Sequence, residues 1–105
     1  MSLDISLLAG KSSESRVYSD NYTGNVCPMW NKAGVCDTLY TSSGKKASEI
    51  TEVIRKGITA MKADPDEYKK LNPDNGWGNY EGALKFLEDL LRNLEEWPDS
   101  TIAIF

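Results

Sequence analysis

Two segments of the chain carry apolar residues at intervals of three and four, which is the spacing of an amphipathic helix. The first begins near Lys46. The second begins at Tyr80, directly after Asn79, a residue type that caps helices well. Their apolar stripes are Ile50, Val53, Ile54, Ile58 and Met61 in the first, and Tyr80, Ala83, Leu84, Leu87, Leu90, Leu91 and Leu94 in the second. Both stripes need an apolar surface to cover, so the chain must fold in packed layers.

Strand patterns stand near the two ends of the sequence. Leu3, Ile5 and Leu7 alternate with polar residues, and residues 16–23 form a second candidate strand after a polar loop at residues 10–15. These two strands are predicted to form a hairpin. The β-branched and aromatic run at residues 101–105 is predicted to be a further strand.

Two short helices are predicted between the strands. Asn25 is expected to cap the first, which ends at Gly34, and Asp64 is expected to cap the second, with Pro65 at its first position. Gly57 lies on the apolar stripe of the first long helix, where a glycine costs stability, so we expect another helix to approach it closely.

The fold class that follows is α+β, with one domain over residues 1–105. A small three-stranded sheet, made of the N-terminal hairpin and the C-terminal strand, is covered on one face by two long and two short helices. No stretch approaches the roughly 18 apolar residues of a membrane span, so no membrane association is predicted. Residues 1–10 lack the pattern of a secretory signal, and the expected location is cytoplasmic.

The net charge of −4 is concentrated in residues 81–105, which carry the whole acidic excess. Such a surface repels phosphate, so direct nucleic-acid binding is disfavoured. Ion pairs of Glu81 with Lys85 and of Glu88 with Arg92 are expected along the helix. The remaining acidic face either is merely solvated, the favoured interpretation, or receives a basic protein partner. The candidate partner surface comprises Glu88, Asp89, Glu95 and Glu96.

The sequence contains no histidine and only two cysteines, Cys27 and Cys36. Neither their spacing nor the remaining residues complete a zinc site, so no metal and no cofactor are predicted. With no export signal, both thiols are expected to be free. A catalytic role for Cys27 is disfavoured because no histidine can activate it, and the carboxylates already have capping or ion-pair roles. No catalytic residue is proposed.

The segment Gly76-Trp77-Gly78-Asn79-Tyr80-Glu81-Gly82 is the most unusual part of the chain. Its glycines permit positive φ and flank two large aromatic residues at a helix start. Trp77 and Tyr80 either form a platform for a planar ligand or fill the core, with Trp77 as a plug under the loop. Turn and cap chemistry favours the second interpretation.

A second group of polar and aromatic residues, between positions 18 and 30, ends the predicted hairpin. This group either is a strand edge with its turn, the favoured interpretation, or lines one cleft together with residues 76–82. In the second case the ligand-binding residues are Asn21, Tyr22, Asn25, Trp30, Trp77, Asn79 and Tyr80.

The run Asn72-Pro73-Asp74-Asn75-Gly76-Trp77-Gly78-Asn79-Tyr80-Glu81-Gly82 resembles a motif in a family of small uncharacterised phage and bacterial proteins. The opening residues 1–5, the turn at residues 21–25 and the ending at residues 98–105 are also similar to that family. The resemblance implies a prokaryotic or phage protein in the cytoplasm and implies no activity. Cys27 and Cys36 belong to no motif shared with the family.

Two hypotheses on function follow. The first is a non-enzymatic protein-interaction or regulatory module, which acts through the acidic helix or an aromatic cleft. The second is a small-ligand site, with or without catalysis, around Trp77 and Tyr80. The second predicts that Trp77 and Tyr22 share one concave pocket.

Overall fold

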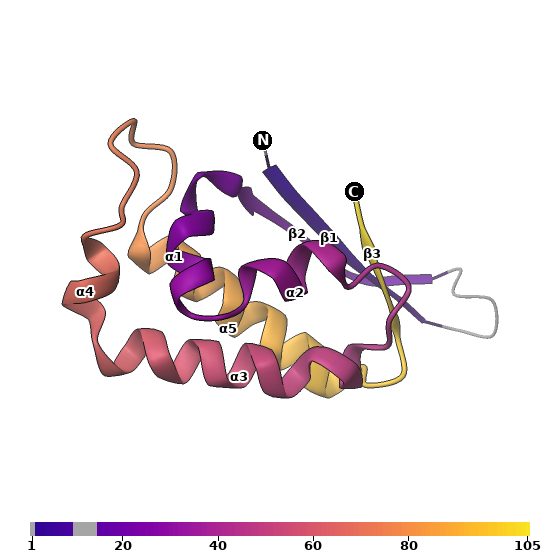
Figure 1. Ribbon diagram of the computed structural model, residues 1–105. Coiled ribbons are helices and arrows are strands. Elements are labelled where there is room, and N and C mark those ends of the chain that lie inside the picture. Colours follow the sequence, from indigo (N-terminus) through magenta and orange to yellow (C-terminus); the bar gives the residue numbers. More distant parts are fainter. Residues whose placement is uncertain (1, 10–14) are drawn as a thin grey trace.

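The computed structural model describes residues 2–9 and 15–105 (Figure 1). Strands β1 (Ser2–Ala9), β2 (Ser15–Thr23) and β3 (Thr101–Ile104) form an antiparallel sheet in the order β2-β1-β3. The predicted three-stranded sheet is therefore confirmed. Most of the predicted loop at residues 10–15 lies outside the described residues.

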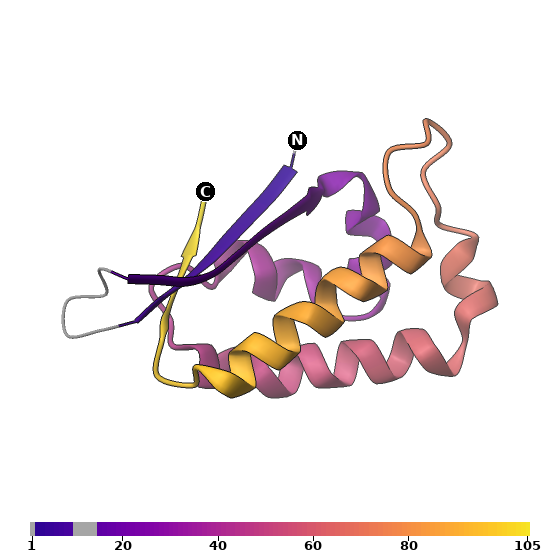
Figure 2. The same cartoon turned by 180° about the vertical axis from the view of Figure 1, so that it is seen from behind.

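The helices lie on one side of the sheet, and the two long helices run side by side (Figures 1 and 2). The predicted α+β class is confirmed, but one short helix was missed, because the described residues contain three short α-helices and a 3-10 turn. In chain order these elements are η1 (Gly24–Val26), α1 (Cys27–Lys32), α2 (Cys36–Thr41), α3 (Ala47–Ala63), α4 (Pro65–Lys69) and α5 (Tyr80–Glu96).

The core lies between the sheet and the helices. Each apolar stripe supplies buried residues, such as Ile54 and Met61 from α3 and Leu87 and Leu90 from α5. The alternating residues of β1, Leu3, Ile5 and Leu7, are fully buried against them. None of the helices in the described residues has the length and the apolar character needed to cross a membrane.

Helix caps differ in part from those predicted. Asn79 caps α5 as expected, because its side-chain oxygen accepts a 2.7 Å hydrogen bond from the Gly82 N–H. Asn25 caps no helix. It lies inside η1, whose cap is Thr23, because the chain tightens into a 3-10 turn one residue after the strand ends. The Asp64 side chain makes no capping bond to α4.

Gly57 is buried on α3, and its neighbour is the connection between α1 and α2 rather than another helix. A methyl group at Gly57 would overlap the Val35 side chain and would lie 3.4 Å from the Ala33 carbonyl oxygen. The expected close approach is present, but a short loop makes it. The absence of a side chain therefore lets the α1–α2 connection pack directly on the α3 backbone.

Cys27 and Cys36 form a disulfide bond, so the expectation of two free thiols is wrong. Gly34, with a φ of +81°, reverses the chain between α1 and α2 and brings the starts of the two helices together. The two Cα atoms are 5.8 Å apart, a usual separation for a disulfide. The sequence separation alone gave no sign of this turn.

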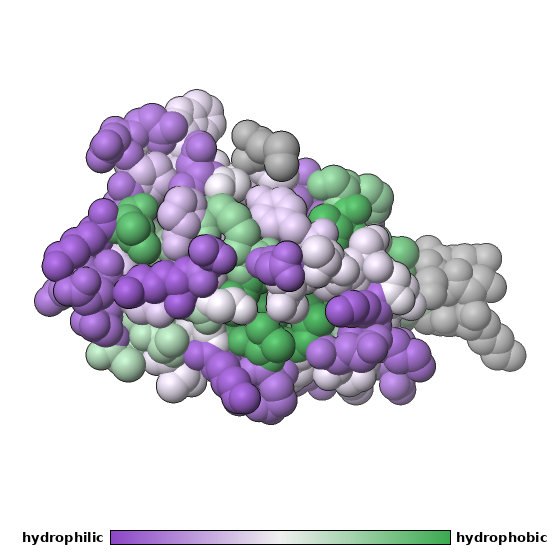
Figure 3. Space-filling view, viewed as in Figure 1, coloured by the Kyte–Doolittle hydropathy of each residue, from purple (hydrophilic) through white to green (hydrophobic). Residues whose placement is uncertain are grey.

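The face seen in Figure 3 is mostly hydrophilic along α3 and α4. Hydrophobic residues show there as separate patches, one between α3 and the short helices, one beside α4 and one near the end of β3. Small scattered patches of this kind are ordinary on a folded surface and mark no docking site.

Candidate functional site

A pocket of about 660 Å³ lies where the end of β2 faces the loop between α4 and α5. Figures 1 and 2 show this loop rising beside η1 and α1. The pocket is open to solvent, and its volume falls within the range of small-ligand pockets, about 300–1,000 Å³. Its lining residues are Ser2, Asn21, Tyr22, Thr23, Asn25, Asn75, Trp77 and Gly78.

Gly78 allows the loop to lie directly against the end of the hairpin. A methyl group at this position would lie 2.6 Å from Thr23 Cγ2 and 2.8 Å from Val26 Cγ1, closer than real side chains come. Gly78 also has a φ of +94°, which is strained for any residue with a side chain. Two independent constraints therefore require glycine here, and both shape the pocket.

Tyr22 joins the same loop to the sheet. Its hydroxyl accepts a 3.1 Å hydrogen bond from the Asn79 N–H, and Gly82 approaches the hydroxyl so closely that a methyl group there would overlap it. The Tyr22 ring packs 6.1 Å from the Trp30 ring and 6.2 Å from the Phe86 ring. The wall of the pocket formed by Tyr22 is thus anchored in the core.

Trp77 is 66% exposed at the edge of the pocket, so the favoured interpretation as a core plug is wrong. Gly76, with a φ of +77°, and Gly78 turn the backbone on either side of it. The Asn75 side-chain oxygen accepts a 2.9 Å hydrogen bond from the Trp77 N–H and fixes the turn. The core position at the start of α5 is already filled by Tyr80, which leaves no place for the indole.

The structure separates the seven candidate ligand residues into two groups. Four of them, Asn21, Tyr22, Asn25 and Trp77, line the pocket together.

The other three lie away from the lining. Trp30 is fully buried and donates a 3.4 Å hydrogen bond to the Ala83 carbonyl oxygen. Tyr80 is also in the core, and its hydroxyl donates a 2.7 Å hydrogen bond to the Met61 carbonyl oxygen. The Asn79 side chain is used by the cap of α5. Trp30 and Tyr80 were candidates for ligand binding as large aromatic residues, but both are buried and neither lines the pocket.

Sequence reasoning missed four lining residues, Ser2, Thr23, Asn75 and Gly78. Ser2 pairs with Thr23 in the hairpin, so the register of the hairpin would have placed the two together. Asn75 and Gly78 belong to the turn-forming run around Trp77, where the glycine flanking an exposed aromatic residue was the available signal.

The described lining is uncharged. Amide and hydroxyl groups supply its polar atoms, and the Trp77 indole and the Tyr22 ring supply its aromatic surface. The Asn25 side-chain nitrogen donates a 3.1 Å hydrogen bond to Thr23 Oγ1, and the side-chain oxygen is an additional acceptor. Within residues 2–9 and 15–105, the Asn21 side chain has no hydrogen-bond partner. Such a lining is chemically suited to hydrogen bonding and stacking rather than to ion pairing.

No family model, curated protein or solved structure matches this chain. The resemblance of residues 72–82 to phage and bacterial proteins therefore stays a prediction from the motif alone. The assignment of the site rests on the geometry and chemistry of the chain itself. Groups of side chains able to hold a metal ion are absent from the described residues.

Four of the five acidic residues of α5 are paired with cations in ion pairs at the surface, and Glu96 is exposed with no ion pair to the described residues. Glu88 lies 2.7 Å from Lys62 and Glu95 lies 2.9 Å from Arg55, both across the contact between α5 and α3. Glu81 is paired with Lys69 rather than Lys85, at 3.9 Å. The predicted pairs along one helix were wrong because α3 and α4 bring cations closer to Glu81 and Glu88 than α5 does.

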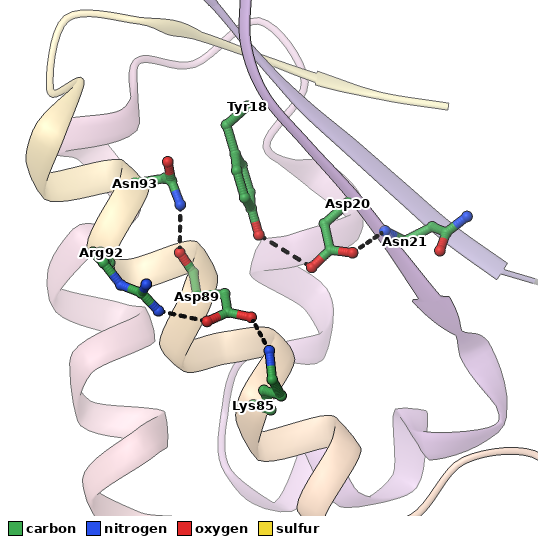
Figure 4. Close-up of polar contacts among 7 residues, drawn as sticks. All are labelled: Tyr18, Asp20, Asn21, Lys85, Asp89, Arg92 and Asn93. Carbon is green, nitrogen blue, oxygen red and sulfur yellow. Dashed lines mark hydrogen bonds and ion pairs between the residues drawn. The ribbon is translucent and has the colours of Figure 1, made fainter.

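Asp89 is the centre of a second cluster, shown in Figure 4. It lies 2.7 Å from Lys85 and also pairs with Arg92, and its side chain is 26% exposed. The hydrogen bond from Lys85 lowers the pKa of Asp89, and the charges of Lys85 and Arg92 act in the same direction. The same contact raises the pKa of Lys85. Both groups are held in their charged forms.

Tyr18 lies beside this cluster on β2, and its hydroxyl donates a 3.1 Å hydrogen bond to Asp20 (Figure 4). Burial raises the pKa of Tyr18 far above its usual value, and the negative charge of Asp20 adds to the effect. Tyr18 therefore stays protonated at neutral pH. Together with a charged Asp89, it forms a structural network rather than a poised acid and base.

The lowered pKa of Asp89 makes stability depend on pH. The pKa of Asp89 is near 3.8 in the unfolded chain and lower in the folded protein. The ionised Asp89 carboxylate therefore stabilises the fold at pH values above 3.8, and this contribution is lost as pH falls through the lower pKa of the folded protein. Asp89→Asn is expected to lower the free energy of unfolding at pH 6 by less than about 1 kcal/mol. Below about pH 4, the free energy of unfolding of this variant is expected to decrease less steeply with falling pH than that of the native protein. Urea unfolding at several pH values measures both effects.

The matched control for Asp89 replaces the two cations, as Lys85→Gln with Arg92→Gln. This variant is expected to bring the carboxyl titration of Asp89, followed by carbon-13 NMR, back toward its ordinary range. An unchanged titration in the control would contradict the assigned cause.

Proposed function

We propose that this chain is a non-enzymatic binding module whose ligand occupies the pocket between β2 and the loop at residues 70–79. The observation that carries the proposal is the exposed indole of Trp77, held by a fixed turn at the edge of a pocket with an uncharged lining. Amides, hydroxyls and an indole recognise a ligand by shape, stacking and hydrogen bonds. The described lining offers no carboxylate, thiol, imidazole or amine to carry out chemistry.

Exposure of Trp77 supports a binding role because tryptophan gains much by burial. An aromatic residue that the fold leaves in water, on a turn built from two positive-φ glycines, resembles the aromatic anchors that dominate interfaces. Trp30, by contrast, is buried in an aromatic cluster and donates a hydrogen bond from its indole. The fold thus buries Trp30 in the core and leaves the Trp77 indole exposed.

The pocket is a better recognition surface than the acidic helix. Three acidic residues of α5 are already paired with cations of the chain itself. Glu88 pairs with Lys62 and Glu95 with Arg55. Asp89 pairs with both Lys85 and Arg92. A basic protein partner would have to displace these internal cations from α5. The proposal therefore does not include the basic partner that the sequence suggested.

The setting within this proposal is bacterial or phage, as the resemblance of residues 72–82 implies. Disulfides persist in oxidising compartments, so the Cys27–Cys36 bond weighs against the cytoplasmic location expected from the sequence.

A library of small molecules tests the proposal on the nitrogen-15-labelled protein. The library contains nucleosides, amino acids, neutral sugars, organic acids and proline-rich peptides, each followed by amide chemical shifts. Binders are expected to shift the Trp77 indole N–H and the side-chain amides of Asn21 and Asn25, and to lose these effects in Trp77→Ala.

The matched control is Trp97→Ala. Trp97 is 37% exposed and follows the far end of α5, so its removal is expected to leave every binder unaffected. A library without any binder at the Trp77 resonances, or binders whose shifts survive Trp77→Ala, would overturn the proposal.

A further inference from the structure

We infer that the ligand of this pocket is a neutral oligosaccharide, which stacks one sugar ring on Trp77 and hydrogen bonds to the asparagine side chains beside it. The inference rests on the proposed function and adds to it the chemical class of the ligand. Four features of the pocket lead to this class: its lack of charge, its polar groups, the exposed indole of Trp77 and its open shape.

The first feature is the absence of charge from the described lining. Anionic ligands such as phosphates and carboxylates need Lys, Arg or an array of backbone N–H groups, and cationic ligands need carboxylates or an aromatic cage. The described lining has none of these cations or carboxylates. A neutral ligand that binds here through hydroxyl groups has no charge to remove from water, so the uncharged lining imposes no penalty for an unpaired charge.

The second feature is the kind of polar group present. An asparagine side chain both donates and accepts hydrogen bonds, and a sugar hydroxyl does the same. The pocket is lined by three asparagines, Asn21, Asn25 and Asn75. The side-chain amide of Asn21 makes no hydrogen bond to other described residues. Adjacent hydroxyl groups on a sugar ring present a donor and an acceptor side by side, which an amide can meet with both of its polar atoms.

The third feature is the exposed indole of Trp77. The C–H groups on one face of a sugar ring form an apolar surface that covers an indole, whose face carries the negative end of its quadrupole. A proline-rich peptide instead docks in a groove between several aromatic residues. Here the Tyr22 ring also lines the pocket, but it is partly buried against Trp30 and Phe86, so Trp77 offers the more exposed aromatic face.

The open shape favours a chain of sugars over a single one. An enclosed cavity would surround a monosaccharide, whereas this pocket of about 660 Å³ is open to solvent. Further sugar units can therefore extend out of the pocket from the unit that stacks on Trp77. Few contacts per unit and an open site imply dissociation constants of about 0.1–1 mM for short oligosaccharides.

The test uses titrations of the full chain with cellotetraose, maltotetraose and triacetylchitotriose, which are neutral, and with tetragalacturonate as a charged comparison. At least one neutral oligosaccharide is expected to shift the Trp77 indole N–H saturably and to quench or enhance tryptophan fluorescence. Trp77→Ala is expected to weaken this binding about tenfold, Trp77→Phe less, and Asn21→Ala about fivefold. Trp97→Ala is the matched control and leaves the dissociation constant unchanged.

Ionic strength gives an independent readout. A neutral ligand is expected to bind equally at about 0.02 M and 0.5 M sodium chloride, whereas a charged ligand would weaken at high salt. The inference is overturned if no neutral oligosaccharide shifts the Trp77 indole, or if tetragalacturonate binds more tightly than all of them. The binding proposal survives that failure when any other member of the library shifts the same resonances, and falls with it when none does.

Discussion

Reduction of the Cys27–Cys36 bond is expected to lower the free energy of unfolding by about 2–3 kcal/mol. The bond closes a loop with a sequence separation of 9, and opening it returns conformational freedom chiefly to the unfolded chain. For a chain of this size, the corresponding fall in Tm is roughly 10–20 °C. Urea unfolding with and without dithiothreitol, followed by tryptophan fluorescence, measures the loss.

The disulfide also fixes buried parts of the fold. Val26 and Val35, each adjacent to one of the cysteines, are fully buried, so loosening the helix starts disturbs core residues as well as the loop. The double variant Cys27→Ser with Cys36→Ser is expected to match the reduced protein and to be insensitive to reductant. Equal unfolding midpoints for the native protein in both conditions, or two free thiols on the folded protein, would contradict the prediction.

Gly78→Ala is expected to lower the free energy of unfolding by about 2–5 kcal/mol. Its positive φ costs a residue with a side chain roughly 1–2 kcal/mol, and the overlap with Thr23 and Val26 adds about 1–3 kcal/mol. The contacted atoms are methyl groups of β-branched residues, which have few alternative rotamers, so they cannot readily move aside. Urea unfolding measures the change.

Gly76→Ala is the matched control for Gly78. Gly76 also has a positive φ, +77°, but a methyl group there would meet no atom within 4 Å. Its replacement is expected to cost only the backbone strain, about 1–2 kcal/mol. The difference between the two variants measures the close approach of the loop to the hairpin. Equal losses would show that the loop does not rest on Thr23 and Val26.

The strands and long helices were predictable because they depend on local periodicity. α3 and α5 each carry apolar residues at helical spacing over 17 residues, and β1 alternates cleanly. α2 was missed because a helix of 6 residues with one buried member, Leu39, shows no period. Its formation depends on the turn at Gly34 and on packing from other parts of the chain.

The candidate site was predictable only in part, because it depends on contacts between distant segments. The polar residues near the end of the hairpin and the aromatic loop could be named from the sequence. Their proximity follows from two glycines, Gly78 and Gly82, that fit against side chains more than fifty positions away. Size was a poor guide to burial, since Trp30 and Trp77 have the same side chain and opposite surroundings.

The order of the strands bears on when the protein can fold during its synthesis. The central strand, β1, is synthesised before β2 and β3, and β2 can pair with it early as a hairpin. Its other edge must wait for β3, because Ile5 pairs with Ile104 in a chain of 105 residues. The sheet is therefore completed only after almost the whole intervening chain has been translated, and β1 keeps an unpaired edge until then. Until β3 emerges, a nascent chain is thus expected to rely on the hairpin for its strand pairing.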